Sequence, residues 1–267
     1  MRFMSTLSTF DVPFDSKPFP FTRFEPCCPE AANATAENGF IPCKQHPIPN
    51  VLGRKINMTE NMVRPPSMRH IVGCVGPEGK EWFRSEVLTV QGSIIREIML
   101  LQKEWMESHR PEFEQFLVVL PTIADRLPLA AKNIQPQDGE QEEPNPDLLL
   151  FPEFKLMPSL VPKPDEIRNN KVLYDILETM WNNPKKPIPH QEKLQDISAN
   201  TVIFVCTHGR RDMRCGKIGP LIVDEFRKVL KEKGLEKEVE VWGTSHFGGH
   251  EFAGNLIIHQ RGLIKSC

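Results

Sequence analysis

The C-terminal part of this chain has a strand–helix–strand–strand pattern that few folds can accommodate. TVIFVC, at residues 201–206, is apolar and largely β-branched, which is typical of a strand buried on both faces. We expect a helix over residues 218–234, with a proline near its start and a glycine at its end, and strands at 238–244 and 255–260. Because strand–helix–strand crossovers are right-handed, the first two strands should lie parallel, with the helix on one face of their sheet.

A second α/β pattern precedes this one. Short apolar runs at residues 69–75, 113–121 and 148–154 predict strands. The apolar residues of 86–108 recur with the spacing of an amphipathic helix, which Pro111 prevents from continuing. The pattern therefore predicts a smaller α/β layer in the first half of the chain.

The chain has 267 residues, which exceeds the usual size of one domain and suggests two domains with additional segments. Residues 1–65 are rich in proline and asparagine and lack periodicity, so we expect an irregular tail. We expect the first α/β domain at 66–163, a helix and a proline-rich linker at 164–197, and the second α/β domain at 198–267.

Charge and hydropathy exclude several classes of partner. The formal net charge of −2 predicts no strong attraction to nucleic acid, and no apolar run is long enough to span a bilayer. The first ten residues, MRFMSTLSTF, contain one arginine, several hydroxyl residues and no acid, which is compatible with a mitochondrial presequence. We expect a mitochondrial location, with a cytoplasmic one as the alternative.

The seven cysteines do not resemble a disulfide framework, because their number is odd and they are widely scattered. In an intracellular protein such cysteines stay reduced or bind metal. Cys267 is interpreted as incidental, and the pattern assigns no role to four others: Cys27, Cys28, Cys43 and Cys74.

Two pairs of metal-binding residue types follow two of the predicted parallel strands. Cys206, Cys215, His246 and His250 have the spacing C-x8-C-x30-H-x3-H. Loops beyond the carboxyl ends of neighbouring parallel strands share one crevice, so we expect the four side chains to converge. Glycines in both loops would let the backbone approach a bulky bound group, namely Gly209, Gly216, Gly248 and Gly249.

The spacing alone leaves the bound group open. Two thiolates and two imidazoles suit either zinc or an iron–sulfur cluster. The separation of the cysteines by eight residues is wide for structural zinc and favours a [2Fe–2S] cluster, in which histidine is an accepted ligand. The alternative is that no metal binds, because a cysteine at the end of a buried strand is often a core residue and a loop histidine is usually solvated.

Other polar residues lie near these four. His208 is either a rival ligand or a proton-carrying neighbour, whereas His259 lies within a strand and is interpreted as structural. Arg210, Arg211 and Arg214 form either a solvated basic loop or a docking site for an acidic electron-transfer partner.

At these residues the chain resembles the sucrase/ferredoxin-like family. The resemblance covers about residues 66–260 and is most specific in VCTHGRRDMRCGKIGPLIVDEF and WGTSHFGGHEFAGNLII. It implies two thioredoxin-like α/β layers, the first degenerate and without a cluster, the second a thioredoxin-like ferredoxin domain. It also implies that Cys206, Cys215, His246 and His250 hold a [2Fe–2S] cluster. Family members usually continue into a further strand where this chain ends in HQRGLIKSC, which leaves the last edge strand of the sheet in question.

These observations together predict an electron-transfer or redox-sensing protein rather than a self-contained enzyme, with no catalytic residues of its own. Its redox donor and acceptor proteins are not identified by the sequence. A thiol–disulfide oxidoreductase is one alternative, although the C-x-x-C motif expected of it is absent. A zinc-stabilised interaction module is the other.

Overall fold

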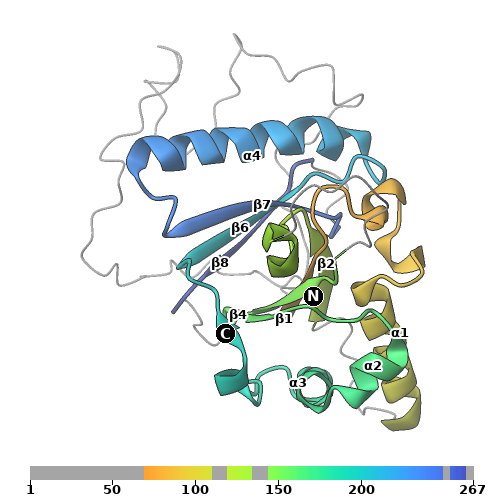
Figure 1. Ribbon diagram of the computed structural model, residues 1–267. Coiled ribbons are helices and arrows are strands. Elements are labelled where there is room, and N and C mark those ends of the chain that lie inside the picture. The colour runs from red at the N-terminus through yellow and green to blue at the C-terminus, as the bar shows by residue number, and fades with distance from the viewer. Residues whose placement is uncertain (1–68, 110–118, 134–143, 249–252, 263–267) are drawn as a thin grey trace, which may run out of the picture. The chain divides into compact units, whose positions relative to one another are not determined.

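The computed structural model describes residues 69–109, 119–133, 144–248 and 253–262, which form a mixed α/β structure (Figure 1). In chain order the first elements are β1 (Arg69–Cys74), α1 (Ile94–His109), β2 (Val119–Ala124), β3 (Asp147–Phe151), β4 (Lys155–Met157), α2 (Pro164–Asn169) and α3 (Lys171–Asn182). They are followed by β5 (Gln195–Asp196), β6 (Thr201–Cys206), α4 (Met213–Lys233), β7 (Val239–Thr244) and β8 (Leu256–Gln260). Four short 3-10 helices lie between them: η3 (Lys80–Phe83), η4 (Val87–Thr89), η5 (Leu129–Asn133) and η6 (Gln191–Lys193).

The eight strands form one sheet in the order β5-β4-β3-β1-β2-β7-β6-β8. Each half has a pair of parallel strands connected through a helix, β1 with β2 in the first half and β6 with β7 in the second. An antiparallel strand pairs with the other edge of the first strand of each pair, β3 with β1 and β8 with β6. The two halves thus repeat one β-α-β-β arrangement and meet at a single antiparallel pairing, Ala124 with Thr244. This architecture agrees with the predicted thioredoxin-like α/β fold.

Helices cover one face of each half of the sheet, and the remaining faces of the two halves pack on each other. In the first half α1, α2 and α3 enclose a core around Ile71, whereas α4 covers Ile203 and Val205 of β6 (Figure 1). The opposite faces join in one apolar cluster that contains Val72 of β1 and Phe204 of β6. Because both faces of each half are covered, the central strands β1, β3 and β6 are buried along nearly their whole length and are mostly apolar.

The helices differ from their predicted boundaries for local reasons. α1 begins at Ile94 rather than near residue 86, because Gly92 has a φ of +68° that a helix does not accommodate. The helix predicted from Pro164 is split in two at Asn170, whose side chain accepts a hydrogen bond from Leu173 N and so starts α3.

The strand predictions were close, with two omissions. β1, β3, β6, β7 and β8 lie within about one to three residues of the predicted bounds, and β2 continues to Ala124, past Pro121. β4 and β5 were not predicted. Both are short, and β5 consists of two exposed polar residues that lack a strand pattern.

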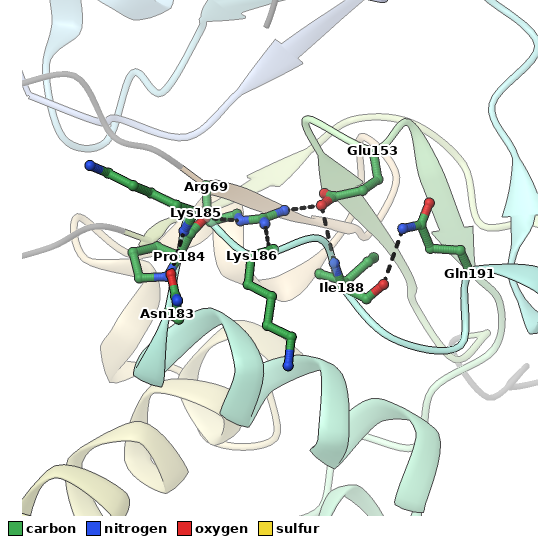
Figure 2. A network of polar contacts seen from close by, with 8 residues as sticks. All are labelled: Arg69, Glu153, Asn183, Pro184, Lys185, Lys186, Ile188 and Gln191. Atoms are coloured by element: carbon green, nitrogen blue, oxygen red, sulfur yellow. Dashed lines mark hydrogen bonds and ion pairs between the residues drawn. The ribbon is translucent and has the colours of Figure 1, made fainter. Parts of the chain in front are cut away.

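A buried arginine attaches the proline-rich linker to the start of β1 (Figure 2). Arg69 Nε donates to Pro184 O at 2.7 Å, and its two Nη atoms donate to Glu153 and to the Lys186 carbonyl. Glu153 in turn accepts from Ile188 N at 3.4 Å. The linker is therefore fixed by hydrogen bonds to a charged group, which are stronger than those between neutral groups.

Several predictions fall outside the described residues. They concern the irregular tail at 1–65 and the cysteines at positions 27, 28, 43 and 267. The proposed boundaries between domains stay a prediction, although the described parts of both halves share one sheet. No strand of the described segments pairs with the outer edge of β8. Among the helices described, none is long and apolar enough to cross a membrane.

Candidate metal centre

Cys206 is the last residue of β6 and lies at the point where the two halves of the sheet meet. Its register partner on β7 is Thr244, which is also the residue that joins β7 to β2. The side chain is 1% exposed and packs with Leu120 and Phe247. The backbone of Cys206 is fixed by its pairing with Thr244 and by the hydrogen bond from its amide to Asn255 O, so the direction of its side chain is set by the strand.

Cys215 lies in the first turn of α4 and not in the loop where the sequence placed it. The helix starts five residues earlier than predicted, because the Asp212 side chain accepts a hydrogen bond from Arg214 N at 2.9 Å and caps it. An aspartate before a helical pattern is a known start signal, so the sequence did contain this information. The positive end of the helix dipole favours a thiolate at Cys215.

His246 completes the group from the loop after β7. Its Nδ1 lies 3.7 Å from Cys206 Sγ, and one ligand atom from each of Cys206, Cys215 and His246 lies within 4.8 Å of the others. In the part of the chain that the structure describes, these are the residues that form a metal-ligating cluster of three. Three of the four predicted ligands are therefore together, and the fourth, His250, lies outside the described residues.

Hydrogen bonds between the two thiols shift their pKa values in opposite directions. Hydrogen bonding to Cys206, and then to His246, lowers the pKa of Cys215 to about 5. Hydrogen bonding to Cys215 and burial raise the pKa of Cys206. Cys215 is thus the more acidic thiol of the metal-free pair, and a bound cation would favour the thiolate form of both.

His208 is oriented by two hydrogen bonds. Its Nε2 lies 2.8 Å from Arg84 O, and its Nδ1 lies 3.4 Å from His246 N. Burial lowers the pKa of this imidazole, so the neutral form is favoured. With both ring nitrogens engaged, His208 is a neighbour of the ligands and not the rival ligand that the sequence allowed.

The three arginines of the loop have different environments. Arg210 and Arg211 are exposed, and Arg211 Nη1 bonds Glu86 Oε1 at 2.9 Å. Arg214 is buried and bonds Asp212, with Nη2 at 2.7 Å from Oδ2. The prediction of one solvated basic loop was therefore wrong for Arg214, because it pairs with the residue that caps α4.

Gly209 of the first loop and Gly216 and Gly219 of α4 allow close packing of backbone segments. A Cβ at Gly216 would lie 2.5 Å from Gly209 Cα, and one at Gly219 would lie 2.3 Å from Cys206 O. The helix therefore approaches the end of β6 more closely than any side chain would allow. Gly248 has a φ of +105°, which agrees with a sharp turn after His246.

The first half has no comparable ligand set among its described residues. Cys74 is the last residue of β1, as Cys206 is the last residue of β6. Cys74 pairs with Ala124, Ala124 with Thr244 and Thr244 with Cys206, so the two cysteines lie in one row across the sheet. Burial raises the pKa of the Cys74 thiol to about 12. Arg126 follows β2 by two residues, as His246 follows β7, and lies 3.8 Å from Asp147. A cation of the protein itself thus occupies the place that corresponds to a ligand.

Comparison with known proteins agrees with this arrangement. The profile described as Sucrase/ferredoxin-like matches residues 62–266, which include both halves and all four predicted ligands. The chain belongs to the sucrase/ferredoxin-like family. The β-α-β-β repeat and the paired cysteines are thus features of a member of this family.

Curated relatives of this member come from several yeasts. Altered inheritance of mitochondria protein 32 of Debaryomyces hansenii is 33% identical over 66% of this chain and 61% of its own length. Its namesake from Meyerozyma guilliermondii is 40% identical over 25% of this chain and 23% of its own length. Actin patches distal protein 1 of Saccharomyces cerevisiae is 33% identical over 27% of each chain. The chain thus spans less than two thirds of these relatives, and no solved structure matches it.

Proposed function

We propose that this protein carries a [2Fe–2S] cluster on Cys206, Cys215, His246 and His250 and acts in electron transfer or redox sensing. The observation that supports this most is the convergence of two thiols and an imidazole within 4.8 Å at the ends of two parallel strands. His250 is proposed as the fourth ligand because it lies four residues after His246 in the sequence, with Gly248 and Gly249 between them. Histidine replaces cysteine on one iron in Rieske centres, so a mixed donor set is chemically sound.

The protein residues would supply orientation, charge and cover. A cluster held by these residues would supply one-electron transfer. Two thiolates and two neutral imidazoles leave its oxidised form near zero net charge, so we expect a potential above the roughly −400 mV of plant-type ferredoxins. The α4 N-terminus and its cap fix the Cys215 thiolate, and the burial of Cys206 keeps water from its sulfur.

The decisive experiment is elemental and spectroscopic analysis of freshly purified, full-length protein. We expect about two irons and two acid-labile sulfides per chain, with a red-brown absorption spectrum. One zinc ion and no sulfide would overturn the proposal.

A zinc-stabilised module is the second candidate, and one distance is compatible with it. Tetrahedral zinc with usual bond lengths places sulfur and nitrogen about 3.6 Å apart, close to the 3.7 Å between Cys206 Sγ and His246 Nδ1. A thiol–disulfide oxidoreductase is less favoured, because both thiols are buried from a protein substrate.

The relatives' names support a location. Several are called altered inheritance of mitochondria protein 32, and we propose that this protein also acts in mitochondria. Imaging of the full chain with a C-terminal fluorescent tag tests this, and exclusively cytoplasmic fluorescence would contradict it. We further propose that exposed Arg210 contributes to docking of an acidic redox partner.

A further inference from the structure

His208 connects the ligand loop to a segment of the first half that is more than a hundred residues away in sequence. The Arg84 carbonyl can only accept, so the hydrogen bond at 2.8 Å requires a proton on Nε2 of His208. Nδ1 is then an acceptor, and the amide of His246, at 3.4 Å, is the donor that faces it. One neutral imidazole tautomer satisfies both contacts at once.

The first half presents an aromatic ring as well as a carbonyl to this imidazole. We define the residues 76–86, which follow β1 and include η3, as the β1 segment. Trp82 of this segment meets the His208 ring edge-on, with centroids 5.8 Å apart. The indole is itself fixed, because its Nε1 donates to Gly76 O at 2.8 Å.

An ion pair fastens the same segment to the same loop. Arg211 Nη1 lies 2.9 Å from Glu86 Oε1, and this ion pair is exposed whereas His208 is buried. The backbone amides of Arg211 and Asp212 both donate to His208 O, so the ion pair and the imidazole belong to one turn. The β1 segment thus contacts the turn through a carbonyl, a ring and a carboxylate.

We propose that His208 is a positioning residue through which the β1 segment of the first half fixes the backbone of the ligand His246. The inference rests on the proposed function only for its consequence, which is that the degenerate half controls the surroundings of the cluster. Its structural content, a fixed tautomer and a held amide, applies to the metal-free protein as well. The first half is then a functional part of the site and not merely a scaffold.

Two substitutions separate the two hydrogen bonds of His208. Asparagine places an amide oxygen near the position of Nδ1, whereas glutamine places an amide nitrogen near that of Nε2. In metal-free, full-length protein we expect His208→Gln to accelerate hydrogen exchange of the His246 amide about five-fold or more, since the acceptor is lost. We expect His208→Asn to restore most of the protection, and Trp82→Leu to cause a smaller acceleration.

Controls distinguish local from general effects. In the His208 and Trp82 variants, exchange of the Cys206 amide, which donates to Asn255 O in the same region, should not change. In the distant control variant His109→Gln, exchange of the His246 amide should not change either. An unchanged His246 amide in both folded His208→Gln and Trp82→Leu would overturn the inference. If those variants do not fold, the ¹⁵N spectrum of the unmodified protein decides, because a proton on Nδ1 of His208 contradicts the proposed tautomer.

The consequence for the cluster is measured separately. In iron-loaded protein, Trp82→Leu should alter the electron paramagnetic resonance g-values of the reduced cluster while both irons are retained. Unaltered g-values would overturn the inference that the first half controls the surroundings of the cluster. Absence of iron from the unmodified protein would instead refute the proposed function and leave the exchange result to stand by itself.

Discussion

At the scale of single residues, the three cysteines among the described residues, Cys74, Cys206 and Cys215, should respond differently to substitution. Cys206→Ser and Cys215→Ser should each abolish the cluster, because each removes a thiolate from the converging group. Cys74→Ala is the matched control: it also changes a buried cysteine at a strand end, but one whose thiol faces Arg126 and Asp147. Iron and sulfide content measures the result, and loss of iron in the Cys74 variant alone would contradict the assignment.

A ligating histidine can be exchanged for a second kind of ligand. We expect His246→Cys to retain a cluster, since thiolate also binds iron, and to lower the potential, since it adds a negative charge. Voltammetry of the unmodified and variant proteins tests this. An equal potential in a variant that still holds its cluster would remove His246 from the ligand set.

The half-buried His259 of β8 leads to a prediction about the acid sensitivity of the fold. Burial lowers the pKa of His259 from about 6.5 to about 4, while its Nε2 contacts His70 Nδ1 at 2.8 Å and its ring stacks on Phe151. The unfolded chain therefore takes up a proton below pH 6.5 that the folded chain refuses until about pH 4. Stability should fall as the pH falls through this window, by about 3 kcal/mol in total for a shift of this size.

The substitution His259→Phe removes this titration and keeps an aromatic ring against Phe151. Chemical denaturation of metal-free protein at several pH values between 7.5 and 4.5 should give a shallower loss of stability for the variant. Parallel pH profiles for the two proteins would show that His259 does not contribute.

At the scale of elements, the close approach of α4 to β6 should be intolerant of a single methyl group. A Cβ at Gly219 would meet Cys206 O at 2.3 Å and Thr207 Cα at 2.9 Å, and both of these neighbours are backbone atoms rather than the end of a flexible side chain. We expect Gly219→Ala to destabilise the protein by about 1–3 kcal/mol, as overpacking usually does, and to weaken iron retention by shifting the helix that carries Cys215. Thermal unfolding and iron content measure both effects.

Lys217→Ala is the control for this prediction, because Lys217 lies in the same helix and is exposed. Its effect on stability should stay within about 0.5 kcal/mol. Equal behaviour of the two variants would show that the contact of α4 with β6 is looser than described.

At the scale of the whole molecule, Arg69 and its hydrogen-bond partners in Figure 2, which we call the clamp, fix the linker between the halves to the first strand. Arg69→Met leaves the Glu153 carboxylate buried without its cation, so we expect a loss of about 3–5 kcal/mol. Arg168→Met, which breaks an exposed pair with Glu104, should cost less than about 1 kcal/mol. Denaturant unfolding compares the two, and similar losses would contradict the role of the clamp.

The double substitution Arg69→Met with Glu153→Met extends the test to the linker itself. It removes both buried charges, and we expect it to recover part of the stability lost in the single variant. Failure to recover any would indicate that the hydrogen bonds to the linker carbonyls of Pro184 and Lys186, and not the ion pair, carry the effect.

The sequence by itself determined the local elements and the identity of the candidate ligands. Apolar runs such as TVIFVC specify buried strands, because both faces of such a strand are removed from water. The candidate ligands could be recognised because they follow strands whose carboxyl ends are neighbours. Helix boundaries were less certain where a single residue decided them. Gly92 and Asn170 acted through a positive φ and a side-chain cap, and Asp212 moved Cys215 into a helix.

Only the tertiary structure decided how distant segments meet. The pairing of Ala124 with Thr244 joins the halves, and nothing in either strand's own pattern specifies the other as its partner. The same holds for His208, whose tautomer is set by the carbonyl of Arg84, 124 residues away. Hydrogen bonds between remote residues depend on the packing of whole layers, and the free energy of that packing is a property of the folded chain and not of any one segment.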